Sequence, residues 1–590
     1  MRKGNARFGK RDMGYVQTLN SLVLGLFASG EPGFWLDPSD LSTMYQDSAG
    51  TTPVTAVEQP VGLILDKSKG LVQGVELVTN GNFVTNTSGW TISEGDGTFV
   101  GNGGSATLTF GTVATAALYA FTATIGKWYY VSYTILANID GGVTGFQFYG
   151  NVGGADVSFQ GGLNAGTYHG FMYATSTTGF VWVRHPFAGS VTITGVSVKS
   201  VAGTHYYQST AGVRPVLSAR VNLLTKTELW TAPWTIDAGL TSATVITAPD
   251  GTNTACSILN KAGTSSHQFY QSSTISTTTI TNSVLAAPGT VGWLGVAFNN
   301  SAAVDGAFFN LSTGALGTVT AGATATITAH PQYAGWYICT VSRTYTAGTK
   351  ALIIEAHTAD NQSSTYSAAG TETVKVWHPD LRPSDQATGL IPTYQRVNTS
   401  TDYDTAGFPL YLSGNGTQWM QCATQDYTGV NKMLVCAGVR KRSDAAASVL
   451  LELSTIVTNA GTFAIYAPNS PGEYVFPLNG TALSGQIATT FNAPITNVLS
   501  VAYDISQASA ALETIPRVNG ATPTLALFGA ASAGTGNFGN YPAYLFCRAG
   551  TSLFLTGNIY GLVARGSTVA SNAAQIAATE NWTDSKCRAY

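Results

Sequence analysis

Few residues of this sequence are spaced for catalysis. A retaining glycoside hydrolase needs two carboxylates about 5–5.5 Å apart, but Glu452 stands alone in the strand-like run LLELS. No HExxH or similar metal-binding spacing occurs, and no serine lies in a GxSxG turn with suitable partners. The histidines are scattered along the chain, at His169, His185, His205, His267, His330, His357 and His378. We therefore predict no catalytic residues, no cofactor and no metal centre, and we expect Glu452 to be a structural residue at a strand edge of a protein that is not an enzyme.

Aromatic side chains are the chemistry that the sequence offers in quantity. Trp, Tyr and Phe make up 11% of the residues, enough to fill several cores and leave rings for a surface. Aromatic rings stack on the C–H faces of sugars, while amides, carboxylates and guanidinium groups bind the hydroxyls. Tyr149, Tyr173 and Trp182 fall at strand ends or on alternating faces of predicted strands, so they are candidates for an exposed glycan-binding platform. The alternative is a place in the core, which we expect for Trp90 and Trp234.

Three aspartates near the N-terminus could be interpreted as metal ligands. Asp37, Asp40 and Asp47 lie close together in sequence, among Pro, Gly and Ser. Asp followed by Pro, Ser or Gly is also typical of tight turns, and Asp40 could cap a short helical turn. We favour turns over a metal site.

The composition indicates an almost all-β protein. Charged residues make up only 10% of the chain and hydrophobic residues 44%, so its polarity comes from Thr, Ser, Asn, Gln and Gly. β-Branched and hydroxyl residues separated by Gly suit strands and tight turns. At roughly 150 residues per domain, 590 residues suggest about four units.

Charge, cysteines and hydropathy exclude several classes of partner. The formal net charge of −3 gives no reason to expect nucleic acid. The six cysteines lack a CxxC spacing, so we expect free, buried thiols and assembly in a reducing cytoplasm. No run approaches the ~20 apolar residues of a membrane span, and the short apolar run 22–27 does not make a signal peptide.

The first 32 residues look like an anchor. The basic arm contains Arg2, Lys3, Arg7, Lys10 and Arg11. A helix is predicted over residues 14–28, because Leu19, Leu22 and Leu26 recur at helical spacing and Gly30 and Pro32 follow. The apolar side chains of this helix have to be buried, either by a partner chain or by the next segment.

Residues 33–70 carry the most specific pattern in the chain. The run GFWLDPSDLSTMYQDSAGTTPVTAVEQPVGLILD resembles a recurrent motif of tailed-phage virion proteins. The motif positions include Trp35, Asp37, Pro38, Ser39, Asp40, Gln46 and Asp47. The resemblance implies a structural protein of a phage particle. We expect residues 1–70 to bind other virion proteins, so that a chain without them folds but does not join the particle.

Two similar segments follow. Residues 75–201 open with ELVTNGNF and SGWT, which resembles the opening of jelly-roll carbohydrate-binding modules. Residues 221–383 repeat it with NLLT, Trp230 and Trp234, and each copy is followed by a Tyr-Gln pair, at 207–208 and 394–395. In that family, acids in the last strand often hold a structural calcium. Here that strand reads TGVSV, without an acid, so the motif does not support the ion.

Residues 402–590 resemble a concanavalin A-like (laminin-G-like) lectin sandwich. Met433 to Arg440 reads as a central strand, and a helix is predicted from about Asn572 to Lys586 with Asn572 and Gln575 as a cap pair. The predicted division is residues 1–32 arm and helix, 33–74 motif segment, 75–201 and 221–383 jelly-roll modules, 402–590 lectin sandwich, with linkers at 202–220 and 384–401.

Together these features predict an all-β phage fibre or tail-associated protein located in the virion. We expect it to display β-sandwich modules to host surface glycans, as a homotrimer, without nucleic acid or membrane insertion. A decoration protein of the capsid head with a purely structural role is the main alternative, and a polysaccharide hydrolase is the third.

Overall fold

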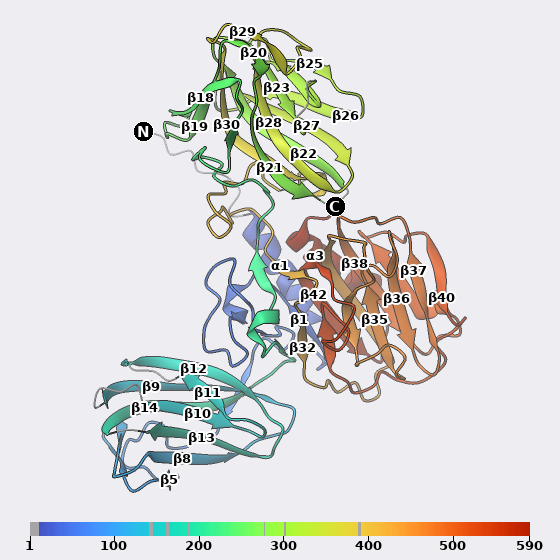
Figure 1. Ribbon diagram of the computed structural model, residues 1–590. Helices are drawn as coiled ribbons and strands as arrows, with labels where there is room; N and C mark the ends of the chain where they lie inside the picture. Colours follow the sequence, from blue (N-terminus) through green and yellow to red (C-terminus); the bar gives the residue numbers. More distant parts are fainter. Residues whose placement is uncertain are drawn as a thin grey trace.

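The computed structural model describes residues 11–140, 146–160, 164–186, 188–275, 278–299, 303–387 and 391–590. The described chain is almost all β and forms three two-sheet sandwiches, which confirms the predicted fold class (Figure 1). In Figure 1 the first sandwich lies at the bottom, the second at the top and the C-terminal one at the right. No helix in the described part of the chain combines the length and hydropathy needed to cross a bilayer.

The first sandwich, module 1, covers residues 73–201. Its strands are β4 (Gln73–Glu76), β5 (Trp90–Glu94), β6 (Thr98–Asn102), β7 (Ser105–Thr109), β8 (Thr115–Thr122), β9 (Trp128–Asp140), β10 (Gln147–Asn151), β11 (Val157–Gln160), β12 (Gly166–Tyr173), β13 (Thr178–His185) and β14 (Gly189–Val201). One sheet has the order β11-β10-β13-β8-β5, and the other has the order β12-β9-β14-β7-β6, with β4 paired to β14. Phe83, Trp90 and Val131 are among the side chains buried between them.

The last strand of module 1 shows how sequence alternation sets its faces. Val191, Ile193, Val196 and Val198 are all buried, and the two pairs are out of phase by one residue. Gly195, at φ +61°, lies where the pairing of β14 with β9 shifts register between Thr194 and Ser197. A bulge there returns the apolar side chains to the core, as the break in the pattern predicts.

The second sandwich, module 2, has the same general plan. Its strands are β17 (Thr235–Ile236), β18 (Leu240–Ile246), β19 (Ala255–Asn260), β20 (Gly263–Ser266), β21 (Phe269–Ile275), β22 (Thr278–Pro288), β23 (Trp293–Ala297), β24 (Gly306–Asn310), β25 (Ala315–Val319), β26 (Ala323–Ala329), β27 (Tyr337–Tyr345), β28 (Gly348–His357), β29 (Thr365–Ala368) and β30 (Thr373–Pro383). The sheets are β17-β21-β28-β23-β24-β25 and β18-β19-β30-β22-β27-β26, with β20 and β29 as a separate pair. Trp230 and Trp234 are buried against Phe269.

The C-terminal sandwich is built from three separate stretches of the chain. Its elements are α1 (Arg11–Gly25), β1 (Gly33–Leu36), β2 (Met44–Tyr45), β3 (Leu63–Ile64), β15 (Tyr206–Tyr207), β16 (Val216–Ser218), β31 (Tyr411–Asn415), β32 (Met420–Cys422), β33 (Lys432–Lys441), β34 (Val449–Leu453), β35 (Thr462–Tyr466), β36 (Tyr474–Asn479), β37 (Leu483–Ala488), β38 (Ile495–Asp504), α2 (Ala510–Glu513), β39 (Thr514–Val518), β40 (Leu525–Gly529), β41 (Ala543–Leu545), β42 (Thr556–Ser567) and α3 (Ala573–Cys587). The seven-stranded sheet is β16-β31-β42-β33-β38-β39 with β1 on β42, and the ten-stranded sheet is β2-β3-β15-β32-β41-β34-β35-β36-β37-β40.

Modules 1 and 2 are therefore insertions into this sandwich. β3 pairs with β15 although module 1 lies between them in sequence, and β16 pairs with β31 across module 2. The predicted linker at 202–220 is wrong in this respect, because it supplies two strands. The described parts of the predicted linker 384–401 also pack on the rest of the chain, since Asp385 pairs with Arg440 and the side chain of Gln395 accepts hydrogen bonds from the backbone of Val221 and Asn222.

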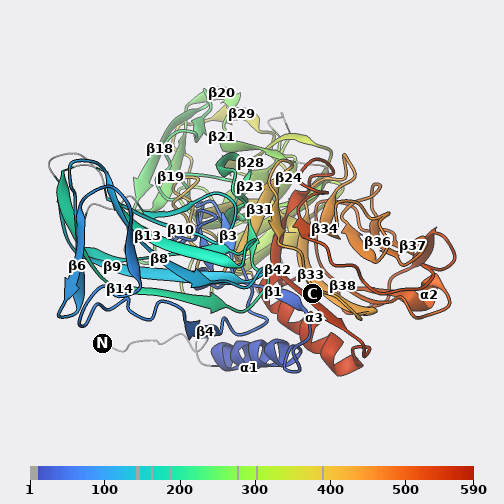
Figure 2. The same cartoon turned by 90° about the horizontal axis from the view of Figure 1, so that it is seen from below.

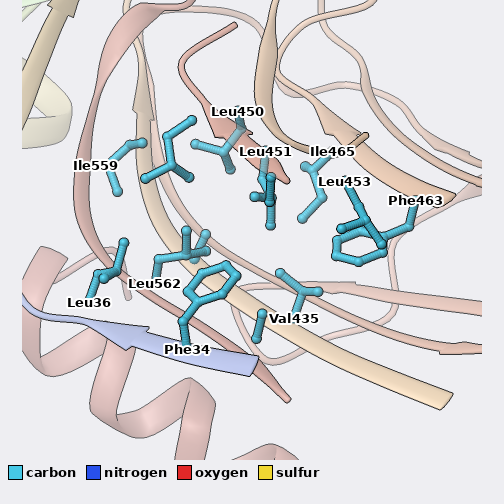
Figure 3. Close-up of a cluster of buried hydrophobic side chains, with 14 of the residues drawn as sticks. Phe34, Leu36, Val435, Leu450, Leu451, Leu453, Phe463, Ile465, Ile559 and Leu562 are labelled. Carbon is cyan, nitrogen blue, oxygen red and sulfur yellow. The ribbon is translucent and has the colours of Figure 1, made fainter. Parts of the chain in front are cut away.

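The motif segment 33–74 also packs within the chain. β1 pairs with β42 from Gly33 opposite Arg565 to Leu36 opposite Leu562. Figure 3 shows Phe34 and Leu36 pointing from β1 into the cluster that contains Leu562 and Val435. The segment therefore supplies core residues of the C-terminal sandwich.

The N-terminal helix finds its burial against the C-terminal one. α1 and α3 lie side by side on the same side of the molecule (Figure 2). Leu19, Val23, Leu26 and Phe27 form a buried cluster with Trp35, Val563 and Trp582. The side chain of Asn20 accepts a 2.9 Å hydrogen bond from the indole of Trp582. Asn572 and Gln575 form the predicted capping box of α3.

Candidate functional site

The outer face of the five-stranded sheet of module 1 carries a row of large planar side chains. Along β13, Val181 and Val183 are buried in the core, whereas Phe180, Trp182 and Arg184 are only half-buried on the opposite face. Alternate residues of a strand point to the same side and are about 6.6 Å apart. The three planar groups therefore form a line along one strand.

Tyr149 and Trp182 meet at the centre of this face. They are directly opposite each other in the pairing of β10 with β13, and their rings stack with centroids 5.3 Å apart and planes 29° apart. On the other side, Trp182 lies opposite Leu118 of β8. Cross-strand aromatic pairs stabilise a sheet, but here both rings also remain accessible.

Arg184 extends the platform because its guanidinium is held on both sides. Its Nε and Nη2 donate to Glu94 at 2.7 and 2.9 Å, and Nη1 donates to Gln147 at 3.0 Å. The hydrogen bonds from Arg184 lower the pKa of Glu94 despite its partial burial. The ion pair is partly exposed, so it adds little to stability, but it fixes a flat charged group beside Trp182.

A shallow depression of about 340 Å³ lies on this face. It is lined by Ser93, Glu94, Ala116, Leu118, Asn151, Asp156, Phe180 and Trp182. The side chain of Asn151 donates a 2.7 Å hydrogen bond to Asp156, so amide and carboxylate groups stand at one end. Aromatic walls with a few placed acceptors are the chemistry that holds a sugar ring.

Tyr173 does not join this site. It lies in β12, in the opposite sheet, where its ring packs 5.6 Å from that of Trp128. Both belong to a joint with the C-terminal sandwich that includes Phe171, Leu63 and Tyr207. Tyr173 is half-buried, as Tyr149 and Trp182 are, but its ring packs into this joint and not onto their face, because alternation gives the side of a sheet and not what lies against that side.

Sequence reasoning missed several members of the face: Leu118, Asn151, Asp156, Phe180 and Arg184. Phe180 and Arg184 could have been found, since they stand two residues before and after Trp182 in a strictly alternating strand. Glu94 and Asn151 come from distant strands, and only the pairing brings them here.

The anchoring residues divide into three groups. Arg2, Lys3, Arg7 and Lys10 lie outside the described residues, and Arg11 is the first residue of α1. Leu19 and Leu26 are buried against α3 and its surroundings. Leu22 is 49% exposed.

The motif aspartates hold the C-terminal sandwich together. Asp37 is buried and forms ion pairs with Lys67 at 3.2 Å and Lys586 at 3.1 Å. Asp40 shares Lys67 at 2.7 Å. Asp47 accepts hydrogen bonds from the backbone of Thr51 and Thr52, as a turn former does.

The other motif residues are equally structural. The Asp37 carboxylate, separated from Ser39 by Pro38, accepts hydrogen bonds from both the backbone N–H and the hydroxyl of Ser39. Gln46 donates to the carbonyl of Pro53. No group of three metal-ligating side chains that could hold an ion occurs among the described residues.

The calcium that the jelly-roll resemblance implies does not fit module 1. One acid beside the last strand is Glu76, whose Oε1 accepts hydrogen bonds from the backbone of Leu77, Val78 and Val198 and whose Oε2 accepts one from Ser197. Both carboxylate oxygens therefore already have protein donors, and a cation would have to displace them.

Glu452 occupies a structural position as well, but inside the ten-stranded sheet and not at an edge, because β34 pairs with both β35 and β41. Its carboxylate is fully buried and accepts hydrogen bonds from Nε and Nη2 of Arg548 at 3.0–3.1 Å. Burial raises the pKa of Glu452 against the lowering effect of Arg548. The buried ion pair with Arg548 is sufficient to explain this carboxylate structurally.

No protein-family model and no curated protein sequence matches the chain. Among solved structures, it is similar to the N-terminal CBM22-1–CBM22-2 tandem domain from Paenibacillus barcinonensis Xyn10C. The identity is 13%, the match covers 54% of this chain and 99% of that chain, and the TM-score is 0.23. Because that TM-score is low, the function has to be inferred from this chain's own residues.

Proposed function

We propose that this chain is a structural and adhesive protein of a tailed-phage particle and that module 1 binds host surface glycans. The observation that carries the binding role is the stacked pair of Tyr149 and Trp182 on an accessible sheet face, with Arg184 fixed beside it. The C–H faces of a sugar can stack on these rings, and its hydroxyls can form hydrogen bonds with Asn151 and Asp156.

The role in a particle rests on the resemblance of residues 33–66 to phage virion proteins. Its partners are other virion proteins, reached through the basic arm and the outer side of α1, where Leu22 is exposed. The chain acts as a homotrimer in the virion, and it is not an enzyme. Basic arms suit contact with an acidic protein surface.

One feature favours the second candidate, a decoration protein of the capsid head. Module 1 is joined to the C-terminal sandwich through a buried aromatic cluster that includes Trp128 and Phe171. A module fixed in this way is a rigid spacer whether or not it binds sugar.

Glycan binding by the full chain tests the proposal. Wild type and the Tyr149→Ala/Trp182→Ala variant are applied to an array of bacterial surface glycans, with Tyr590→Ala as the control because Tyr590 is an exposed ring elsewhere. We expect binding by wild type and Tyr590→Ala, weakened about tenfold or more in the double variant. Equal binding by all three proteins would remove this face as the site.

Location in the particle needs a separate measurement. Antibodies against module 1, used in immunogold electron microscopy of purified particles, distinguish tail from head. Labelling on the tail supports the adhesive role, and labelling over the whole head supports decoration. Particles without the protein would contradict both.

A further inference from the structure

A second aromatic surface lies on module 2. On the outer face of the sheet that contains β30, β22 and β27, Trp377 is opposite Leu285 and Leu285 is opposite Ile338. These three side chains form an apolar row across three strands, in one cluster that also contains Tyr333 and Trp336.

The hairpin loop between β26 and β27 folds back over this row. Tyr333 and Trp336 meet the ring of Trp377 edge-on, with centroids 5.6 and 6.2 Å away. Trp377 is only 2% exposed, while Tyr333 and Trp336 are half-buried and the Ala334–Gly335 turn between them is exposed. His330 stacks on Tyr333 at 4.6 Å. Trp377 thus supports two rings that still reach solvent.

Polar groups stand beside these rings. The indole N–H of Trp377 donates to the hydroxyl of Thr254 at 2.9 Å, and that hydroxyl is 2.6 Å from the hydroxyl of Thr252. The carboxylate of Asp250 accepts hydrogen bonds from the hydroxyl and backbone N–H of Thr252. Asp250 and Thr252 are both exposed, at the end of this chain of hydrogen bonds.

We propose that Tyr333, Trp336 and Asp250 form a second carbohydrate-binding site, specific for neutral sugars. The two rings contact the C–H face of a sugar, and Asp250 with Thr252 binds its hydroxyls. The exposed carboxylate disfavours anionic glycans by repulsion. The site lies in a different module from the Tyr149–Trp182 face and does not depend on it. Two sites on one chain would raise avidity for a polymer.

Titration of the full chain with neutral oligosaccharides selected from a glycan array tests this site. The variants are Tyr333→Ala/Trp336→Ala, Asp250→Asn and the control Tyr333→Phe, each also in the Tyr149→Ala/Trp182→Ala background. Asp250→Asn alters an exposed group, so it tests binding even if loss of both rings disturbs folding. Thermal unfolding of each variant reports on folding.

We expect binding that persists in the Tyr149→Ala/Trp182→Ala variant and falls about tenfold or more on adding Asp250→Asn or the loss of both rings. Tyr333→Phe should bind as wild type does. The inference is overturned if the Tyr149→Ala/Trp182→Ala variant binds no neutral glycan, even though wild type does. It is also overturned if Asp250→Asn and Tyr333→Ala/Trp336→Ala leave the residual binding unchanged. Residual binding lost only through Tyr333 and Trp336 would support it even if the site on module 1 proved wrong.

Discussion

The backbone N–H of Trp35 donates a 2.7 Å hydrogen bond to the carboxylate of Asp66, across thirty-one positions of the chain. The same carboxylate accepts from the backbone N–H of Ser68 and of Thr204, both at 2.7 Å. The buried carboxylate of Asp66 therefore connects three segments by hydrogen bonds: β1, the turn after β3, and the segment that follows module 1. The motif of residues 33–66 is explained by folding of the C-terminal sandwich.

Replacing Asp66 should destabilise that sandwich. Asp66→Ala leaves the two buried N–H donors of Trp35 and Ser68 without an acceptor, at a cost of about 1–3 kcal/mol each, and also the partly buried N–H of Thr204. Asp66→Asn keeps one acceptor oxygen and should cost less. Hydrogen exchange of β42 measures the local free energy of opening, with module 2 as the internal control. Equal protection in wild type and Asp66→Ala would refute the role of Asp66.

Asp37 should make the C-terminal sandwich sensitive to acid. Burial raises the pKa of Asp37, but the ammonium groups of Lys586 and Lys67 and the hydrogen bond from Ser39 outweigh it, so the pKa lies below its ordinary value. The unfolded chain then takes up the proton first as the pH falls. The stabilisation is present above the ordinary pKa of about 3.9 and is lost as the pH falls through the lowered value.

Asp37→Asn tests this pH dependence. At neutral pH the variant should be less stable by about 3 kcal/mol, because two lysines lose a buried partner. The difference should shrink below about pH 4. Urea unfolding monitored by hydrogen exchange of α3 at several pH values measures it. A difference that stays constant down to pH 2.5 would show that Asp37 is not the titrating group.

Truncation separates the arm from the fold. Removing residues 1–10 should leave all three sandwiches intact. Removing residues 1–70 takes away β1, β2 and β3 and the buried side chains of Phe34, Leu36 and Met44, each worth roughly 2–5 kcal/mol. We expect the C-terminal sandwich of the shorter chain to be unfolded by near-UV circular dichroism and proteolysis. A natively folded 71–590 chain would show that residues 1–70 are not needed for folding, and would favour a role of this segment in binding another virion protein.

The position of β1 marks the limit of what the sequence predicts. Alternation along Val191 to Val198, the strand at Met433 and the cap pair Asn572–Gln575 are local patterns, and the structure confirms them. The pairing of Gly33 with Arg565 spans more than five hundred residues. No local pattern identifies the pairing partner of a four-residue strand, so the sequence alone assigns β1 to a separate segment.

The candidate site shows the same limit. Two of its members, Tyr149 and Trp182, were expected from alternation, and the register of β10 against β13 brings them together. Tyr173 satisfies the same pattern but faces the C-terminal sandwich. The sequence indicates which residues leave the core of one module, whereas the contacts between modules decide which of them lie on an open face.

Glu452→Gln should leave glycan cleavage unchanged, because the carboxylate is occupied by Arg548. The variant should be less stable, since Arg548 loses a buried charged partner. Reducing-end release from host polysaccharide measures the first effect and thermal unfolding the second. A robust hydrolase activity in wild type that disappears in a folded Glu452→Gln protein would contradict the non-enzymatic role.

Module 1 should be removable as a unit. Its two ends are adjacent, since the backbone N–H of Ala202 donates a 3.0 Å hydrogen bond to the carbonyl of Val72. A short Gly-Ser connection between Gly70 and Gly203 can therefore close the gap with little strain.

The excised residues 71–202 contain their own core around Phe83 and Val131. We expect both the shortened chain and isolated module 1 to fold, each with the strand content of its part by far-UV circular dichroism. Removal of module 1 exposes Leu63 and Leu65, which pack with Trp128 and Phe171 in the joint. The shortened chain could therefore aggregate although it folds. The variant Leu63→Thr/Leu65→Thr of the shortened chain removes these exposed apolar side chains and serves as the control. Failure of isolated module 1 to fold, with the shortened chain intact, would mean that the joint and not the core stabilises module 1.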